Sequence, residues 1–355
     1  MYKPYMNARL SNIELLRFIA MIMILLVHAN YAILGDVSIA DFQQNPVPSF
    51  TRMLFEQLCV VAVNVFVLIS GWFGIKASLK GAMSLVFQVV FYSVIITVIS
   101  ALLKGEYSLI TIRNLFPLYY MYWFVAAYLI MYVLSPVLNA FAELASKKTF
   151  AAVLICYFAL EMFYGFLTDM GKFIGGYSAI SFVGIYLLAR YLKIHSLKSN
   201  NTNIARNLGL YVIFTLIPVL MVFGGDTWIV RVFNSNAYNS PFVLFASLFL
   251  FLAFVRMNFH SKVVNWLAAS SFAIYVIHSH PLIFPIYSNA IQSIYASVSV
   301  FTYVICAIIL AIIIGVTCVV IDQLRIVVWR WFCKSFLDKV FVVLDSTFAK
   351  IVDAS

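Results

Sequence analysis

The sequence has 355 residues, of which 64% are hydrophobic and only 10% charged, and its mean hydropathy is +1.01. A water-soluble protein of this size could not cover its surface with so few polar groups, so the composition excludes a soluble globular domain. The net charge of +10 does not require nucleic acid as a partner, because an excess of Lys and Arg is also typical of loops in membrane proteins.

Long apolar runs occur throughout the chain. A bilayer core of about 30 Å needs about 20 apolar residues per helix. Runs of roughly this kind lie at 13–34, 53–73, 82–103, 117–139, 150–167, 177–194, 207–223, 241–259, 263–287 and 298–321. They are continuous and do not alternate as barrel strands do. We therefore predict an all-α fold, a polytopic membrane helical bundle of about ten transmembrane helices.

The basic residues are distributed unevenly between the two sets of loops. Of the 23 Lys and Arg, Arg17 lies inside the first run, 17 fall on the side of both termini, and 5 fall on the other side: Arg52, Lys104, Arg113, Lys172 and Arg231. By the positive-inside rule both termini are expected in the cytoplasm, with the protein in the inner (cytoplasmic) cell membrane. Residues 1–321 are expected to form the transmembrane domain, and 322–355 a cytoplasmic amphipathic tail.

The five cysteines are scattered through or beside apolar runs, at positions 59, 156, 306, 318 and 333. They form no CxxC pair and no cluster, so neither a disulfide framework nor a metal site is expected.

The first run contains three ionisable residues, Glu14, Arg17 and His28. Arg17 and His28 are 11 residues apart, or three helical turns plus about 20°, so both side chains should project from one face about 16 Å apart along the axis. Glu14 lies one turn from Arg17 and can pair with it. A neutral imidazole in the membrane can act as a general base, and a guanidinium suits an anionic ligand. The structural alternative is an anchoring Arg17 and a hydrogen-bonded core His28.

Several segments together resemble the acyltransferase 3 family of bacterial membrane enzymes. The first is ExLR followed by ten residues and His28; the others are VNVFVLISGWFGIK (63–76), YWFVAAYLIMYVLSPVLN (122–139) and SSFAIYVIHSHPL (270–282). The resemblance implies an O-acetyltransferase that uses acyl-coenzyme A, acetyl-CoA by default, as co-substrate, with no permanently bound cofactor. It implies a glycan or lipid-linked glycan of the cell envelope as acceptor. His28 would be the general base or the acyl carrier, with Glu14 and Arg17 beside it in the site.

The resemblance also implies a coenzyme-binding region around Arg17 and Ser70. Many members carry an Arg pair after the Ser70-Gly71 step, where this sequence offers Lys76 and Lys80. Lys76 and Lys80 are therefore expected to bind the coenzyme as point charges, without an Arg-specific contact, because lysine lacks the forked donors of arginine. The positive-inside rule alone would also place lysines at these positions.

A second group of residues is expected near the site by depth. His278 lies 15 residues into the ninth run, as His28 does in the first, so the two rings should reach similar depth and could share a cavity, with His278 as a further catalytic residue. Asn64, Trp123, Tyr128 and Tyr275 are candidates to line the cavity, and Glu161 needs a partner inside the fifth run. Packing or a hydrogen bond to a neighbouring helix is the alternative for each. His195 and His280 are expected at the surface.

A different class of protein fits the same composition. A polyprenyl-linked sugar exporter would also place polar groups at mid-membrane and be basic inside, but it would neither bind nor consume acyl-coenzyme A. No repeat of two halves is visible, which disfavours this alternative. Nothing in the sequence indicates an oligomeric state.

Overall fold

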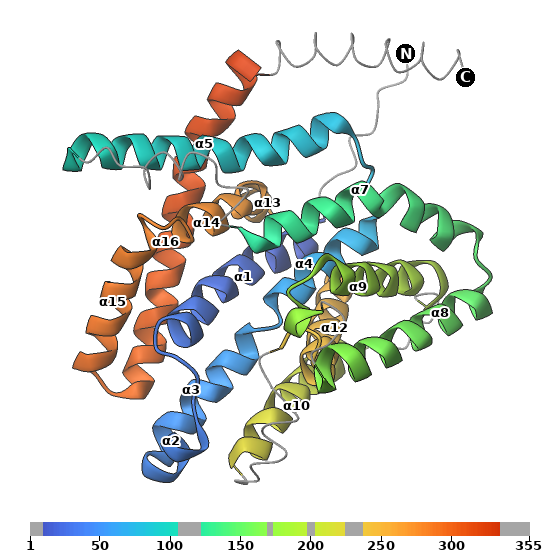
Figure 1. The fold of residues 1–355 in the computed structure, drawn as a ribbon, viewed down its shortest axis with the longest axis horizontal. Coiled ribbons are helices and arrows are strands. Elements are labelled where there is room, and N and C mark those ends of the chain that lie inside the picture. Colours follow the sequence, from blue (N-terminus) through green and yellow to red (C-terminus); the bar gives the residue numbers. More distant parts are fainter. Residues whose placement is uncertain (1–9, 106–121, 169–172, 197–202, 224–236, 334–355) are drawn as a thin grey trace.

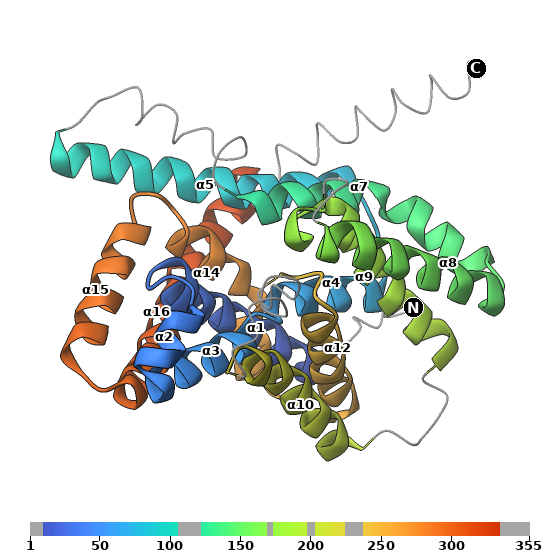
Figure 2. The same ribbon diagram turned by 60° about the horizontal axis from the view of Figure 1, so that its bottom comes forward.

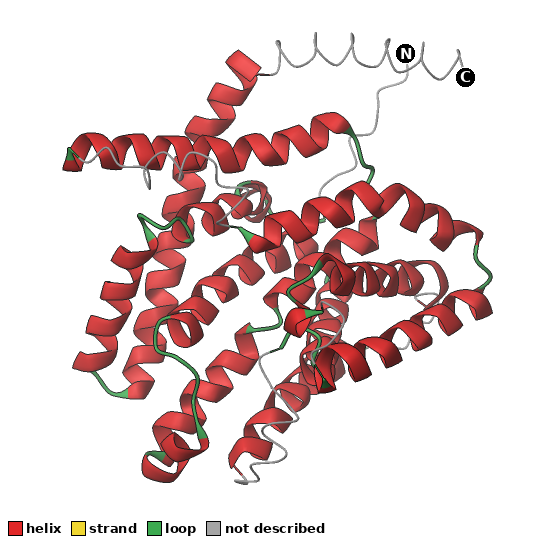
Figure 3. Cartoon of the chain, viewed as in Figure 1, coloured by secondary structure: helices red, strands yellow, loops and turns green. Residues whose placement is uncertain are grey.

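A computed structural model of the chain describes residues 10–105, 122–168, 173–196, 203–223 and 237–333, and this part contains helices and no strand (Figures 1 and 3). Its α-helices are α1 (Ser11–Val27), α2 (Ile39–Gln44), α3 (Pro46–Cys59), α4 (Ala62–Phe73), α5 (Leu79–Lys104), α7 (Trp123–Leu144), α8 (Lys147–Leu160), α9 (Ala179–Tyr191), α10 (Ile204–Phe223), α12 (Pro241–Arg256), α13 (Lys262–Ala269), α14 (Ser271–His278), α15 (Phe284–Ser297) and α16 (Val300–Val328). Four π-helical segments extend α-helices: η1 (His28–Ala32), η3 (Glu161–Leu167), η5 (Leu192–Ser196) and η6 (Trp329–Cys333), and η4 (Ile174–Gly176) is a short 3₁₀ turn.

Within the described residues, seven helical stretches are long and apolar enough to cross a membrane: Ser11–Ala32, Pro46–Phe73, Leu79–Lys104, Trp123–Leu144, Lys147–Leu167, Ile204–Phe223 and Val300–Trp331. Each overlaps one of the apolar runs in the sequence. The run at 241–259 corresponds to the shorter apolar helix α12, and 177–194 to α9 followed by its π-helical turn. The total of about ten spans and the side of each terminus stay predictions.

The run at 263–287 does not form the single helix that its hydropathy predicted. It is divided into α13, α14 and the beginning of α15. At the first break Ser270 leaves helical geometry, with φ −111° and ψ 8°. The second break follows His278, and Pro281 disfavours helical geometry in the residue before it. Hydropathy indicates that a segment is buried in lipid or protein but not where its helix breaks, so it did not predict either interruption.

The first two long stretches form the centre of the bundle (Figure 1). Protein buries 67% of the apolar window of Ser11–Ala32 and 83% of that of Pro46–Phe73, but only 28 to 33% of the other five windows. α1 packs against α4, α13, α14 and α16, and α4 packs against α9 and α12. The peripheral helices turn large apolar side chains outward, which is the arrangement expected where the solvent is lipid.

Small residues allow the central helices to approach closely. A Cβ added to Gly71 of α4 would overlap the carbonyl oxygen of Tyr186 in α9. In α16 the inward positions are Ala307, Ala311 and Gly315, each four residues after the last, while isoleucines face outward. Such spacing of small residues is typical of helix contacts inside membranes.

Two features lie at the margins of this bundle. α5 runs across α16 and not alongside it, as Figures 1 and 2 both show. α16 continues to Val328, so the boundary expected at 321 does not coincide with a helix end. The remainder of the expected tail, 334–355, lies outside the described residues.

Candidate active site

His28 is the first residue of the π-helical segment that follows α1, at the centre of the bundle. π-Helical turns within α-helices are frequent at functional sites. Two residues later, Asn30 donates a hydrogen bond from Nδ2 to Glu56 Oε2 at 3.0 Å, and its Oδ1 accepts one from Arg52 Nε at 3.2 Å. These contacts with α3 hold the π-helical segment in place.

The structure brings His28 and His278 into contact. Their rings come from segments 250 residues apart, and His28 Nδ1 lies 2.9 Å from His278 Nε2. His278 is fully buried, whereas His28 is half-buried. The equal depth inferred for the two rings from the sequence agrees with their contact, but only His28 lines the cavity described below, so the two rings do not share it as expected.

The hydrogen-bond partners of the pair determine where the protons sit. His278 Nδ1 lies 2.6 Å from the carbonyl oxygen of Ile274, and because a carbonyl only accepts, Nδ1 donates. In neutral His278, Nε2 is then an acceptor, so His28 Nδ1 must donate to it. His28 Nε2 is left with its lone pair, which is the state that a general base or a nucleophile requires.

His28 lines a cavity of about 130 Å³ with a largely aromatic wall, the His28 cavity. Its wall is Ile24, Val27, His28, Tyr31, Ala32, Val63, Trp123, Phe124, Tyr177, Tyr238 and Tyr275. Trp123 lies 4.5 Å from Tyr177 and stacks on Tyr238 at 5.8 Å, both measured between ring centroids. Aromatic faces with phenol hydroxyls suit a partly apolar ligand that carries hydroxyl groups.

Trp123 and Tyr275 were expected in this wall, but Tyr31, Tyr177 and Tyr238 were missed. Tyr177 and Tyr238 belong to connecting segments outside the α-helices. Helical periodicity says nothing about how such segments fold back onto a helix. Asn64, expected in the cavity, is instead fully buried and donates from Nδ2 to the carbonyl oxygen of Tyr238 at 2.8 Å. Asn64 therefore holds one wall of the His28 cavity in position.

Arg17 lines a second cavity of about 180 Å³, the Arg17 cavity, together with Met21, Phe66, Ile69, Ser70, Leu85, Phe124, Tyr128, Ser271 and Phe272. Glu14 accepts hydrogen bonds from Arg17 Nη1 at 3.0 Å, as the spacing of three residues predicted. The Ser70 hydroxyl lies 3.2 Å from that of Tyr128. The cavity thus combines a guanidinium with three hydroxyl-bearing residues, Ser70, Tyr128 and Ser271, in an otherwise apolar wall.

Phe124 belongs to the walls of both cavities. Its ring stacks on Tyr128 at 5.8 Å on one side and contacts Tyr275 at 5.7 Å on the other, between centroids. Arg17 and His28 therefore face neighbouring cavities with a common wall, and not one continuous cavity. A ligand that reached from Arg17 to His28 would have to displace this ring.

The two lysines of the predicted coenzyme region lie apart from the Arg17 cavity. Lys76 and Lys80 are exposed, and neither contributes to its wall. Basic residues that the sequence did not single out lie on α9 and its π-helical extension. Arg190 pairs with Glu143 at 3.4 Å, and the Lys193 ammonium lies over the Trp72 ring at 4.4 Å from its centroid.

Glu161, the first residue of η3, lies in neither of these cavities. Its carboxyl group receives a hydrogen bond from the Ser181 side chain, and no contact with a catalytic His is found among the described residues.

Glu56 was missed by the sequence analysis, although it lies inside the apolar run 53–73, where every ionisable residue is a candidate for a functional role. The expectation that His280 lies at the surface was wrong, because His280 is fully buried, whereas His195 is partly exposed.

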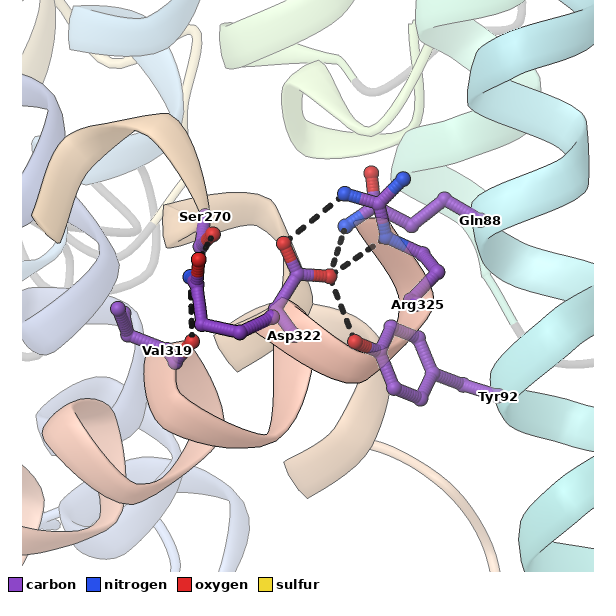
Figure 4. Close-up of polar contacts among 7 residues, drawn as sticks. Gln88, Tyr92, Ser270, Val319, Asp322 and Arg325 are labelled. Carbon is purple, nitrogen blue, oxygen red and sulfur yellow. Dashed lines mark hydrogen bonds and ion pairs between the residues drawn. The ribbon is translucent and has the colours of Figure 1, made fainter. Parts of the chain in front are cut away.

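A buried ion pair between Asp322 and Arg325 of α16 was also missed by the sequence analysis (Figure 4). Asp322 accepts hydrogen bonds from Arg325 Nε at 2.6 Å and from Tyr92 at 2.6 Å. Arg325, counted among the loop cations, is only 8% exposed. One residue further along α16, Gln323 donates to Ser270, which precedes Ser271 of the cavity wall. These contacts join α16 to α5 and to Ser270, the residue between α13 and α14. Within the described residues, no cluster of His, Cys, Asp or Glu could hold a metal ion.

Comparison with known proteins gives one match. The family model Acyl_transf_3, described as an acyltransferase domain, matches residues 10–320. No curated protein and no solved structure matches the chain. The matched range contains both cavities and the pair of histidines.

Proposed function

Because the chain belongs to the acyltransferase 3 family, we propose that it moves an acyl group, acetyl by default, from acyl-coenzyme A to a hydroxyl group of a cell-envelope or exported polysaccharide. The family makes the chain a membrane acyltransferase. The observation that carries the finer proposal is the His28–His278 contact, which leaves His28 Nε2 unprotonated in a residue that lines a cavity.

In this reaction His28 is the general base. Its Nε2 takes the proton as the acceptor oxygen attacks the thioester carbonyl, the carbon–sulfur bond breaks, and the coenzyme thiolate leaves and is protonated from the imidazolium. His278 accepts the hydrogen bond of Nδ1–H throughout and stabilises the transient positive charge. The same Nε2 could instead carry the acyl group before onward transfer, which is the second route that the sequence left open.

Arg17 binds the anionic donor in the proposal. The coenzyme carries several phosphate charges and cannot cross lipid, so it approaches from the cytoplasm, the side to which the excess of basic loops assigns the Arg17 end of α1. A forked guanidinium fixed by Glu14 suits a phosphate or carbonyl oxygen. The acyl arm then passes Phe124 to reach His28, so this ring has to move in each cycle.

The first experiment measures acyl-coenzyme A binding and consumption by the purified protein carrying His28→Ala or Arg17→Ala. His28→Ala should bind the donor normally and turn over about 10²- to 10⁴-fold more slowly. Arg17→Ala should bind it about ten- to a hundredfold more weakly, because a charge-assisted hydrogen bond is lost.

Ile312→Ala, at an outward-facing position of α16, is the control for both variants. Full turnover in His28→Ala would contradict the assignment of His28 as general base. A wild-type protein that never consumes acyl-coenzyme A would favour the alternative function, that of a polyprenyl-linked sugar exporter. A labelled acyl group retained on the denatured protein and absent in His28→Ala would identify His28 as the acyl carrier.

A further inference from the structure

A third hollow, larger than the two cavities of the site, lies between α8, η3, α9 and α12. This α8–α12 groove has a volume of about 530 Å³, within the range of small-molecule sites. Its wall is almost entirely apolar, with Leu154, Ile155, Phe158, Leu244 and Phe245 among the lining residues. Ile155 is 71% exposed and Phe245 43% exposed, so the groove opens on the side of the bundle that faces lipid.

Two buried polar side chains in this wall are incompletely bonded. Glu161 is 3% exposed and Asn239 is 7% exposed. Glu161 Oε1 and both polar atoms of the Asn239 amide lack a hydrogen-bond partner among the described residues. Leaving such atoms unpaired in an apolar surrounding is unfavourable, so a ligand that supplies the missing hydrogen bonds is indicated.

The residues that line the groove indicate the chemical class of that ligand. No basic residue is among those that line it, so a phosphate placed against Glu161 would meet a carboxyl group without a compensating cation. Glu161 Oε1 and Asn239 together offer acceptors and a donor, which match hydroxyl groups. An alkyl chain would occupy the apolar part. The ligand is therefore a lipid whose first polar groups are hydroxyls.

The polar end of the groove adjoins the His28 cavity. Asn239 lines the groove, and the preceding residue, Tyr238, lines the His28 cavity. Asn64 fixes the carbonyl oxygen of Tyr238, and Gly165 leaves room for the Asn239 amide, since a Cβ there would come within 2.8 Å of Nδ2. A sugar held at Asn239 would thus lie next to Tyr238, a residue of the wall of the His28 cavity.

We propose that the α8–α12 groove binds the alkyl chain of a glycolipid acceptor, with Glu161 and Asn239 bonded to the first hydroxyls of its sugar. The sugar then extends past Tyr238 toward His28. This inference rests on the proposed function, because it assigns the acceptor of that reaction and its route of entry from the membrane.

The test uses a photoreactive probe, dodecyl glucoside with a diazirine in its chain, on the full-length protein in phosphatidylcholine nanodiscs. The probe should label peptides of α8 and α12, and excess dodecyl glucoside should compete. Ala151→Trp places a large ring in the groove and should reduce labelling about tenfold. Its matched control is Ala152→Trp, the exposed neighbour outside the groove, which should label as the wild type does.

The sugar contacts are tested with Asn239→Leu. Labelling by the glucoside probe should fall, while labelling by a diazirine-bearing alkane without the sugar should not change. Equal labelling of the Ala151→Trp and Ala152→Trp proteins, or equal effects of Asn239→Leu on both probes, would overturn the proposal and leave bulk lipid as the occupant. Consumption of acyl-coenzyme A is measured separately, so an inactive protein that still shows groove-dependent labelling would reject the proposed function and not the glycolipid site.

Discussion

At the scale of single residues, His278 fixes which nitrogen of His28 carries the proton, although His278 itself lines neither cavity of the site. Its bond to Ile274 leaves one acceptor nitrogen, and that nitrogen orients His28. A residue of this kind acts on the rate of the chemical step and leaves substrate binding largely unchanged. This separates the role proposed for His278 from the donor-binding role proposed for Arg17.

Replacement of His278 should therefore lower kcat more than it changes KM. His278→Leu removes the acceptor, so His28 Nδ1–H loses its partner and the ring can adopt the wrong tautomer; we expect kcat to fall about 10- to 100-fold, as for other groups that orient a reacting ligand. In His278→Gln the side-chain oxygen can accept in place of Nε2, and part of the rate should return. The measurement is steady-state acyl transfer at matched protein levels.

A purely structural His278 would produce another pattern. The Leu and Gln variants would then lose protein abundance together, and the remaining folded protein would keep its kcat.

At the scale of elements, close approach between central helices depends on glycine. Gly71 follows Ser70 of the Arg17 cavity, and α4 packs against α9 at this point. The family-like Ser-Gly step thus has two physical functions, a hydroxyl in the cavity and the absence of a Cβ at the helix contact. Polar cavities in a helical bundle keep their shape only if the helices around them cannot shift.

Gly71→Ala should destabilise the bundle by about 1–3 kcal/mol, because the added Cβ meets backbone and not a flexible side chain. Gly209→Ala in α10 is the matched control. A Cβ at Gly209 has nothing within 4 Å, and alanine favours a helix, so this variant should be neutral or slightly more stable. Thermal unfolding in detergent compares the two, and equal unfolding temperatures would contradict the role given to Gly71.

At the scale of the whole molecule, the distribution of charge predicts the orientation in the membrane. The side with 17 of the 23 basic residues is expected to face the cytoplasm. This expected orientation would give the Arg17 cavity access to the proposed cytoplasmic donor and would put α2 on the opposite side. The proposed direction of acyl transfer depends on it.

Single cysteines in a cysteine-free variant test the orientation. Ala40→Cys in α2 and Lys147→Cys at the start of α8 both place the thiol at an exposed position. An impermeant maleimide added to intact cells should label Ala40→Cys only, and permeabilised cells should show labelling of both. Labelling of Lys147→Cys in intact cells would reverse the orientation and, with it, the side from which the donor enters.

Local features of the sequence were sufficient to predict the membrane location, the all-helical fold class and the pairing of Arg17 with Glu14. Each depends on neighbours within a few turns, where hydropathy and the 3.6-residue period carry the information. The approximate positions of seven long helical stretches followed for the same reason.

Only the tertiary structure decided the contacts between distant segments. His28 meets His278 across 250 residues, Phe124 separates the two cavities, and Tyr177 and Tyr238 enter the wall from connecting segments. Neither hydropathy nor helical period specifies which faces of two helices meet, or how a loop returns to the bundle. The sequence therefore determined which ionisable residues lie in the membrane, because burial follows from local composition. Packing determined which of these residues can act together, because a contact between distant segments is a property of the assembled fold.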